Sequence, residues 1–541
     1  MRHPRPPHLV AVSLLALAAL AVRAVSLDAQ SLWRDEVDAL RFATAPWAEM
    51  LANLTRPGWN GPLYFLLLRG WIALTGTSEY ALRFFSLAFG TLCVPLAYVL
   101  GRRLFDPQVG FLAALLMAAS PYLTWYGQEV KMYTLVPALA LLALYGLRRA
   151  VEGSGWHWWA VQVIATSLAF YSHILAALLI PVQVLCYFAW WPQARRQWIG
   201  ALASLACLTL PYLPLAAWQA PLVLQVRETG FYPYTLGEMA EILLNGWSTG
   251  ILTWGWPWGA VLMGALAVWG LVSPPSPPPP LTGGGLEEGS THPTLSPPPT
   301  RGGLGEGSTH PTLSPPPTRG GLGEGRARLA LLGWLVIPLL AVWLVSLRQP
   351  LFTDRYLVWT APAFCLLVAL GLVSLYRLGE RGCALPRMFS RVAVVLLAGA
   401  ILVVNGVNLW QQATLPIKSD FRAAATYLSG HYTPGELIVF QIPYGRYTFD
   451  YYFPPEAYPW AEGLYTNHRA PDGSYLMNEQ EAAYRMQEMT EGYNVVWLVV
   501  TEMEMWDQRG LVKAWLEAHM HRADEAHFAR VDVYRYVKRE T

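Results

Sequence analysis

About eleven apolar segments occupy the first 410 of the 541 residues, and they constrain the fold more than any other feature. A helix needs about 17–25 mostly apolar residues to cross the hydrocarbon core of a bilayer. Only 14% of all residues are charged, against about 25% in an ordinary soluble domain. The sequence therefore predicts a polytopic α-helical membrane protein. Its expected spans lie near 8–26, 81–100, 109–125, 132–147, 157–171, 174–191, 198–218, 251–273, 329–347, 357–376 and 391–410.

The charged residues divide the chain at about residue 411. Residues 1–410 carry 26 basic and 18 acidic side chains, whereas residues 411–541 carry 12 basic and 18 acidic ones. The second part thus has the composition of a water-soluble domain, and its negative charge argues against a nucleic-acid partner. Helical patterns at 420–428 and 505–519 alternate in it with strand patterns at 436–441, 494–500 and 528–537. This alternation predicts a small α/β domain.

The basic residues of the loops predict the orientation in the membrane. Segment 61–77 is short and apolar, and Arg69 at its centre would cost about 2.5–3.5 kcal/mol on insertion scales. If this segment does not span, the arginine pairs that follow the apolar segments all fall on the same side as Arg2 and Arg5. The positive-inside rule places that side in the cytoplasm. We therefore expect 61–77 to be an interfacial helix at the outer surface, with the N-terminus inside and residues 411–541 outside.

Residues 274–325 form a low-complexity insert, in which GSTHPTLSPPPTRGGLGEG recurs with an 18-residue period. Proline and glycine dominate it, and without apolar periodicity it cannot bury a core, so we expect a disordered linker. It separates an N-terminal transmembrane core, 1–273, from C-terminal transmembrane helices, 326–410. The first apolar segment also has the features of a secretory signal, but the spans that follow it favour a retained helix.

The first outer segment places acidic residues directly after the first apolar span. In SLWRDEVD, residues 31–38, Asp35 and Glu36 follow Arg34 at the expected membrane surface. A carboxylate at that place is a natural general base for a hydroxyl group. The same residues would also suit a solvated loop with Trp33 as its interface anchor.

The second outer segment is a turn that is rich in polar and aromatic residues. YLTWYGQEVKMY contains Tyr126, Gln128, Glu129 and Lys131 between two expected spans. Ionisable groups so close to hydrocarbon are candidates for a functional site. An ion pair between Glu129 and Lys131 would explain them equally well.

Three further outer helix ends carry candidate residues. His173 ends one helix, Arg83 begins another, and Arg355 and Tyr356 lie in QPLFTDRY. Each also has a simpler explanation: a packing histidine, a snorkelling arginine, or an ion pair of Arg355 with its neighbour Asp354.

Carboxylates, cationic side chains and aromatic rings therefore gather at the outer ends of four hairpins. A pocket of this kind binds phosphate through charge-assisted hydrogen bonds and activates a hydroxyl. No P-loop or GxGxxG follows a strand, and the cell exterior has no pool of sugar nucleotides, so we expect a transferase here to take a donor from the lipid. The five cysteines show no metal-ligand spacing. The sequence predicts no required cofactor and leaves a divalent metal open.

The order of these motifs resembles that of the GT-C glycosyltransferases. SLWRDEVDAL is followed by GPLYFLLLRGWIALTGTSEYALRFFSLAFGTLCVPLAYVLGRRLF, SPYLTWYGQEVKMYTL and DRYLVWTAPAFCLLVALGL. The resemblance covers about residues 8–410. Within the GT-C class, the sequence more specifically resembles family 39. That family groups protein O-mannosyltransferases, aminoarabinose lipid A transferases and bacterial enzymes of the dolichyl-phosphate-mannose type. The linker is foreign to the pattern.

The resemblance implies a polyprenyl-phosphate-linked sugar as donor, an external hydroxyl of a lipid, glycan or protein as acceptor, and inversion at the anomeric carbon. It implies Asp35 as the catalytic base, Glu36 as the residue that orients it or binds the acceptor, and Glu129 as a second acidic site. The remaining candidates are assigned to substrate binding: Arg34, Arg83, Tyr126, Gln128, Lys131, His173, Arg355 and Tyr356. Among them, Arg355 best matches the motif for the leaving phosphate.

Two other classes of protein compete with a glycosyltransferase. A secondary transporter would carry ionisable groups near the midplane on broken helices, often with an internal repeat. A membrane-anchored binding protein would use residues 411–541 and would not need Asp35 or Glu129. The acids at the outer helix ends favour the enzyme, which we expect in a bacterial inner membrane, in contact with membrane lipids, with its C-terminal domain external.

Overall fold

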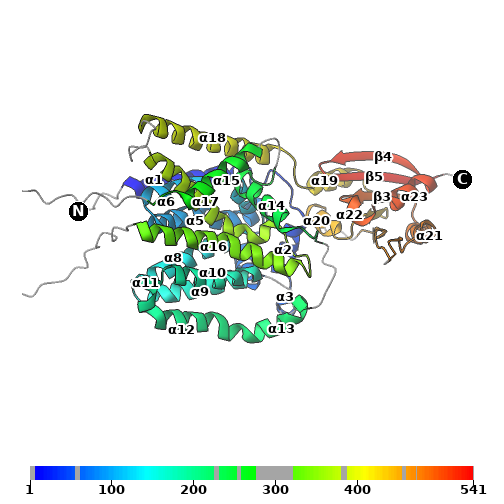
Figure 1. Cartoon of the computed structure of the whole chain (residues 1–541). Coiled ribbons are helices and arrows are strands. Elements are labelled where there is room, and N and C mark those ends of the chain that lie inside the picture. Colours follow the sequence, from blue (N-terminus) through cyan, green and yellow to red (C-terminus); the bar gives the residue numbers. More distant parts are fainter. Residues whose placement is uncertain are drawn as a thin grey trace, which may run out of the picture.

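The helices form one elongated body, and a sheet domain lies at one end of it (Figure 1). The computed structural model describes residues 7–54, 61–224, 231–252, 257–275, 321–378, 387–453, 458–470 and 472–539. Helices of the apolar part, with η marking 3-10 helices, are α1 (Pro7–Ala24), α2 (Arg34–Thr44), α3 (Trp47–Leu54), α4 (Pro62–Thr75), α5 (Glu79–Leu104), α6 (Pro107–Ala118), α7 (Pro121–Gly127), α8 (Leu135–Val151), α9 (His157–Ser172), η1 (Ile174–Leu178), α10 (Leu179–Ala189), α11 (Trp191–Ala194), η2 (Arg195–Gln197), α12 (Trp198–Thr209), η3 (Leu210–Tyr212), α13 (Leu213–Leu224), α14 (Leu236–Thr249), α15 (Pro257–Val272), α16 (Gly321–Ser346), η4 (Asp354–Thr360), α17 (Ala361–Leu378) and α18 (Arg387–Thr414).

The described helices make a multi-pass membrane protein. Five stretches are long and apolar enough to cross a bilayer: Glu79–Leu104, Trp191–Ala217, Gly323–Ser346, Asp354–Leu378 and Met388–Thr414. The bent pair of α6 and α7 would make a sixth, and four shorter apolar helices accompany them. Each of the eleven predicted segments overlaps at least one helix, but several of these helices are shorter or more broken than expected.

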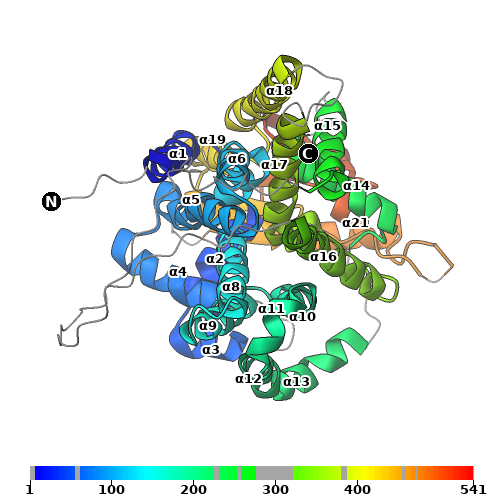
Figure 2. The same ribbon diagram turned by 60° about the vertical axis from the view of Figure 1, so that its left-hand side comes forward.

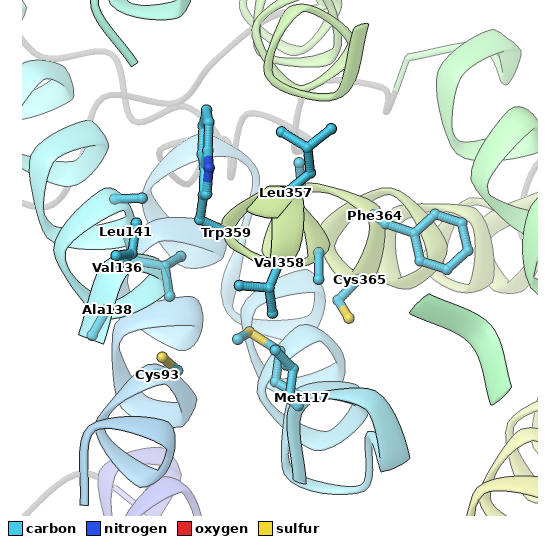
Figure 3. Packing of buried hydrophobic residues seen from close by; sticks show 14 of the residues in the cluster. Cys93, Met117, Val136, Ala138, Leu141, Leu357, Val358, Trp359, Phe364 and Cys365 are labelled. Carbon is cyan, nitrogen blue, oxygen red and sulfur yellow. The ribbon is translucent and has the colours of Figure 1, made fainter. Parts of the chain in front are cut away.

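The stretch Asp354–Leu378, which is η4 followed by α17, is the centre of the helical body. It is 94% buried, whereas Met388–Thr414 is 17% buried and Trp191–Ala217 only 11%. Figure 2 shows α18 and α12 at the periphery, with α17, α5 and α6 between them. Side chains of α5, α6 and α8 pack around the junction of η4 and α17 (Figure 3). The exposed apolar faces of the two peripheral stretches suit contact with lipid.

Small residues bring neighbouring helices into close contact. A Cβ added at Gly110 of α6 would lie 2.6 Å from the Tyr98 carbonyl of α5. One added at Gly371 of α17 would lie 2.1 Å from the Leu266 carbonyl of α15. Both positions therefore need glycine, as helix crossings in membranes commonly do.

Arg23 stabilises the break between α6 and α7, which meet at an angle of 57°. Pro121 has no N–H for the carbonyl of Met117, four residues earlier, so the helical ladder ends there. Arg23 Nη2 donates to that carbonyl at 2.7 Å, and its Nε donates to Thr124 Oγ1 at 3.2 Å. This buried arginine on α1 thereby fixes the direction of α7, which leads into the polar turn.

Basic residues of the loops gather at the end of the body opposite the sheet domain. Arg103 and Arg148 both pair with Glu152, and Arg377 pairs with Asp106 at 2.8 Å. The acidic helix α2 lies at the other end, beside the sheet domain (Figure 1).

The segment 61–77 contains the helix α4, which packs against α2, α9 and α5. Its central Arg69 donates to the carbonyls of Ala43 and Ala45, at 3.0 and 2.6 Å, and lies over the ring of Trp47. These carbonyls end α2, where a cation is favourable. Arg69, whose charge would make a membrane span of 61–77 costly, thus has hydrogen-bond partners at the end of α2.

The sheet domain confirms the predicted small α/β unit. It contains α19 (Phe421–His431), β1 (Leu437–Phe440), α20 (Gly445–Tyr452), β2 (Trp460–Glu462), α21 (Glu479–Thr490), β3 (Val495–Val500), α22 (Met503–Trp506), α23 (Leu511–His519), β4 (Met520–Phe528) and β5 (Val531–Lys538). The strand order is β2-β1-β3-β5-β4; the first three strands are parallel and the last two join antiparallel. Alternate side chains of the strands form two cores, one under α19 and α20 and the other under α21 and α23.

Two predicted boundaries are corrected. The expected helix 505–519 is two helices, α22 and α23, because the Asp507 carboxylate accepts the N–H groups of Leu511 and Val512 and Gly510 takes a left-handed conformation. Helix α16 begins at Gly321, inside the predicted linker. Residues 276–320 of that linker lie outside the described residues.

Candidate functional site

Asp35 and Glu36 are consecutive residues of α2, and they face different surroundings. Successive side chains on a helix point about 100° apart. Glu36 faces the helical body and is completely buried, whereas the side chain of Asp35 is 25% exposed. The adjacent acids are therefore not equivalent.

Glu36 is the centre of a buried hydrogen-bond network. Arg83 of α5 donates to both of its oxygens at 2.8 Å, and Lys418 donates to Oε2 at 2.9 Å. The backbone N–H groups of Val130 and Trp33 supply two more hydrogen bonds. Burial alone would raise the pKa of Glu36, but Arg83 and Lys418 hold it at about 2. Glu36 is thus a permanently charged junction between α2, α5, the polar turn and the tail.

Arg83 has no N–H left for a ligand in this arrangement. Besides Glu36, its guanidinium donates to the carbonyls of Leu27, Gln30 and Ser31, at 2.7 to 3.0 Å. These carbonyls belong to the segment between α1 and α2. Arg83 is therefore placed to shape the first outer loop.

Glu129 has an unsatisfied carboxylate. The residue is 1% exposed, and its Oε2 has no hydrogen-bond partner among the described residues. Burial raises the pKa of Glu129 to about 7, with Lys418 opposing the shift and Glu36 adding to it. A group of this kind exchanges a proton near neutral pH, as an acid–base residue does.

Lys131 lies in the same turn, and within the described part of the chain its ammonium has no hydrogen-bond or ion-pair partner. Burial lowers its pKa, while Asp35, Asp38 and Glu129 raise it. The expected alternative, an ion pair of Glu129 with Lys131, is absent from the described structure. Both side chains thus keep their polar ends available.

Asp35 meets Arg355, which is 320 residues later in the sequence. Arg355 Nη1 donates to Asp35 Oδ2 at 2.5 Å, and both side chains are about one quarter exposed. Arg355 Nε is buried without a partner among the described residues. The guanidinium lies about 6 Å from the ring centres of Trp33 and Tyr356. The guanidinium therefore keeps N–H groups that an anionic group can use.

Aromatic residues hold the segment that carries Arg355. The hydroxyl of Tyr126 donates to Asp354 Oδ2 at 2.7 Å, so Asp354 pairs with α7 rather than with Arg355. The ring of Tyr356 lies 5.1 Å from that of His173, which itself caps η1 through its Nδ1. Tyr126, His173 and Tyr356 are thus neighbours of the site that fix its shape.

Two predicted residues lie apart from this cluster. Arg34 is half exposed, pairs with Asp38 at 3.7 Å and stacks over the ring of Tyr444 in the sheet domain. Gln128 donates to the carbonyl of Arg23 at 2.8 Å and so links the polar turn to the end of α1. Their contacts support the architecture around the site.

Sequence reasoning missed Lys418, which lies at the start of the tail. Composition assigned it to the soluble domain, and nothing in its neighbourhood marks it as buried. Its side chain is only 6% exposed, and its ammonium lies 5.3 and 5.9 Å from the ring centres of Trp125 and Trp33. Only the tertiary structure brings it beside Glu36.

The described side chains contain no group of three or more His, Cys, Asp or Glu residues that could hold a metal ion. The cluster instead combines two carboxylates with open oxygens, Asp35 and Glu129, with two cations that have unused N–H groups, Lys131 and Arg355. Such an arrangement can accept a proton from a hydroxyl and bind a phosphate.

Residues 56–218 match the family described as dolichyl-phosphate-mannose-protein mannosyltransferase. No curated protein sequence matches the chain significantly. The matched region contains α4, α5, the polar turn and His173, but not Asp35 or Arg355.

Solved structures resemble almost the whole chain. ArnT from Cupriavidus metallidurans in the apo state is 14% identical, with a TM-score of 0.56 and 98% of each chain covered. The same protein bound to undecaprenyl phosphate gives a TM-score of 0.52 at 13% identity, with 97% of each chain covered. The Archaeoglobus fulgidus oligosaccharyltransferase in complex with Zn and sulfate gives 0.53 at 13% identity, over 97% of this chain and 73% of the other.

Proposed function

Because the chain has the fold of GT-C glycosyltransferases and matches a mannosyltransferase family over 56–218, we propose that it is a membrane glycosyltransferase of the family 39 type. It moves a sugar from a polyprenyl phosphate to a hydroxyl of an external lipid, glycan or protein, with inversion at the anomeric carbon. The resemblance to an undecaprenyl-phosphate complex supports the class of donor.

The contact between Asp35 and Arg355 is the observation that carries this proposal. It places a candidate base and a candidate phosphate-binding residue side by side at the end of the helical body that carries α2 and the sheet domain. Asp35 Oδ1 makes no hydrogen bond with the described residues, so it can accept a proton. Nε of Arg355 and the ammonium of Lys131 can bind an anion.

The reaction is a single displacement. The acceptor oxygen attacks the anomeric carbon on the face opposite the phosphate, and Asp35 takes the hydroxyl proton as the new C–O bond forms. The bond from carbon to the phosphate oxygen breaks, and its electron pair leaves with the polyprenyl phosphate. Arg355 and Lys131 stabilise that negative charge, while the sugar passes through an oxocarbenium-like transition state.

Glu129 and Glu36 have different roles in this scheme. Glu129, with its open oxygen and raised pKa, binds an acceptor or sugar hydroxyl and exchanges a proton with it. Glu36 and Arg83 keep the first outer loop in place. Tyr126, His173 and Tyr356 position the segment of Arg355, and Arg34 and Gln128 support α2 and the polar turn.

We further propose the orientation and location of the protein. The N-terminus and the basic loops face the cytoplasm of a bacterial cell, segment 61–77 lies along the outer surface of the inner membrane, and residues 411–541 are external. The separation of the basic loop ends from α2 and the sheet domain supports this orientation. About eleven membrane segments then precede the external domain, and a cytoplasmic linker that ends before Gly321 joins α15 to α16.

The experiment that tests the proposal is a donor assay with the purified full chain. Undecaprenyl phosphates that carry different hexoses and pentoses are incubated with the protein and a lipid and glycopeptide extract of the cell envelope. We expect release of undecaprenyl phosphate from at least one donor, and its loss in Asp35→Asn. Use of a sugar nucleotide in place of every lipid donor, or solute uptake into proteoliposomes without any release, would overturn the proposal.

A further inference from the structure

Lys418 belongs to the tail but lies in the membrane site. Its ammonium is 2.9 Å from Glu36 Oε2, and the ring centres of Trp125 and Trp33 lie 5.3 and 5.9 Å from it. A buried ammonium is costly unless it is paired, so this position requires the carboxylates that surround it.

Gln30 holds the backbone at Lys418. Its side-chain oxygen accepts the N–H groups of Ile417 and Lys418, at 3.1 and 2.9 Å. Its side-chain nitrogen donates to the carbonyls of Gln412 and Leu415 at the end of α18. One glutamine of the first outer loop thus fixes the whole turn between α18 and the sheet domain.

The sheet domain is docked beside this turn. Arg422 of α19 pairs with Glu79 at the start of α5, and its Nη2 donates to the carbonyl of Asp28 at 2.8 Å. The hydroxyl of Tyr452 donates to Glu79 at 2.6 Å and accepts the N–H of Leu32. Docking of the domain therefore sets the position of the segment that delivers Lys418.

Glu129 interacts electrostatically with several charged and titratable groups from five segments. Those facing it are Lys418 of the tail segment, Glu36 and Asp35 of α2, Arg355 of η4, Tyr64 of α4, and Tyr126, Lys131 and Tyr133 of the polar turn and its helix. Lys418 is the largest of the opposing influences on the proton affinity of Glu129. Glu129 makes no hydrogen bond through Oε2 with the described residues, so burial and the charges around it set its protonation state.

We propose that Lys418 is a positioning residue of the transferase site, which holds Glu36 in place and stabilises the carboxylate form of Glu129, and that the tail domain completes the site by delivering it. The part of this inference that concerns catalysis rests on the proposed function. The effect of Lys418 on the protonation of Glu129 is expected without any substrate, so it can be measured without one.

The test is an infrared titration of the full chain in nanodiscs. The C=O stretch of a protonated carboxyl that disappears in Glu129→Gln reports the protonation of Glu129. We expect a midpoint near pH 7 in the wild type. In Lys418→Met, the midpoint rises by about one unit or more, because removal of a nearby opposite charge disfavours the carboxylate. Lys418→Arg retains the charge. Its midpoint should therefore differ from that of the wild type by less than half of the shift seen in Lys418→Met.

Lys513→Met is the matched control, because Lys513 lies on α23 and contacts Tyr534 within the sheet domain. It leaves the midpoint unchanged. If Lys418→Met does not fold, Gln30→Leu serves instead: it loosens the turn with every charge retained, and we expect a smaller shift in the same direction.

An unchanged midpoint in the folded Lys418→Met or, where that variant does not fold, in Gln30→Leu overturns the inference. So does the absence of a Glu129 band that titrates between pH 5 and 9. The titration needs no donor, so its failure is distinct from a failed donor assay.

Discussion

Arg355 Nη1 lies 2.5 Å from Asp35 Oδ2, so the second half of the chain closes the site that the first outer loop begins. The two residues are 320 positions apart, and η4 brings Arg355 to α2 from the buried centre of the helical body. The pair is therefore the most direct target for mutation.

Asp35→Asn is expected to lower the transfer rate by about 10²–10⁴-fold, because the amide cannot take the acceptor proton. The change keeps the shape of the side chain, so the affinity for the lipid donor should change little. Single-turnover release of undecaprenyl phosphate measures the effect. Asp38→Asn is the matched control: Asp38 lies one turn later on α2 and pairs with Arg34 and Arg41, both at 3.7 Å. Equal losses in the two variants would contradict the assignment of Asp35.

Arg355→Gln is expected to weaken the binding of undecaprenyl phosphate and to reduce turnover, because the phosphate loses a charge-assisted donor. Direct binding of the labelled lipid to the protein in nanodiscs measures the affinity. Arg377→Gln is the control at the other end of the same helical stretch, where Arg377 pairs with Asp106. Wild-type affinity in Arg355→Gln would remove Arg355 from the phosphate site.

Arg83→Gln is expected to destabilise the fold by about 3–5 kcal/mol, because it leaves the buried carboxylate of Glu36 without its main partner. The carbonyls of Leu27, Gln30 and Ser31 lose their donor as well. Thermal unfolding in detergent measures the loss. Arg102→Gln, an exposed arginine at the end of the same helix, should have almost no effect. If Arg83→Gln is as stable as the wild type but binds the lipid donor more weakly, Arg83 binds the ligand instead of holding the loop.

Glu129 gives the stability of the protein a pH dependence with a definite sign. Its pKa is raised to about 7 in the fold, above an ordinary value near 4.5, so the folded protein retains a proton that the unfolded chain releases. Stability through this group is therefore greatest below pH 4.5 and falls as the pH rises towards 7. Thermal midpoints of wild type and Glu129→Gln across this range measure the difference between them. The glutamine variant should lack this decrease, and parallel curves would contradict the raised pKa.

The orientation can be tested with single cysteines in a cysteine-free background. Ser429→Cys on α19 is exposed and should react with a membrane-impermeant maleimide in intact spheroplasts. Ser154→Cys, beside Arg149 in the turn between α8 and α9, should react only after the membrane is opened. Reversed labelling of the two positions would reverse the topology.

Local sequence patterns are sufficient to predict those helices and strands that lie in one kind of surroundings along their whole length. Long apolar runs such as α5 and α17 are predictable because a helix satisfies its own backbone in lipid. The strands β3 and β5 are predictable from their buried or alternating residues. The helix 505–519 was not predictable as a whole, because its break depends on a cap from Asp507 and on the left-handed Gly510.

The sequence by itself indicated the membrane class, a change in composition at about residue 411 and the short segments between apolar runs that hold the polar residues. These follow from composition and periodicity, which act along the chain. The tertiary structure alone decided that Glu36 and Arg83 satisfy each other, that Glu129 and Lys131 do not, and that Lys418 of the tail enters the site. Those distinctions depend on which charged groups of α2, α5 and the tail meet in the fold. Such contacts join residues that are far apart in the sequence, so no local pattern specifies them.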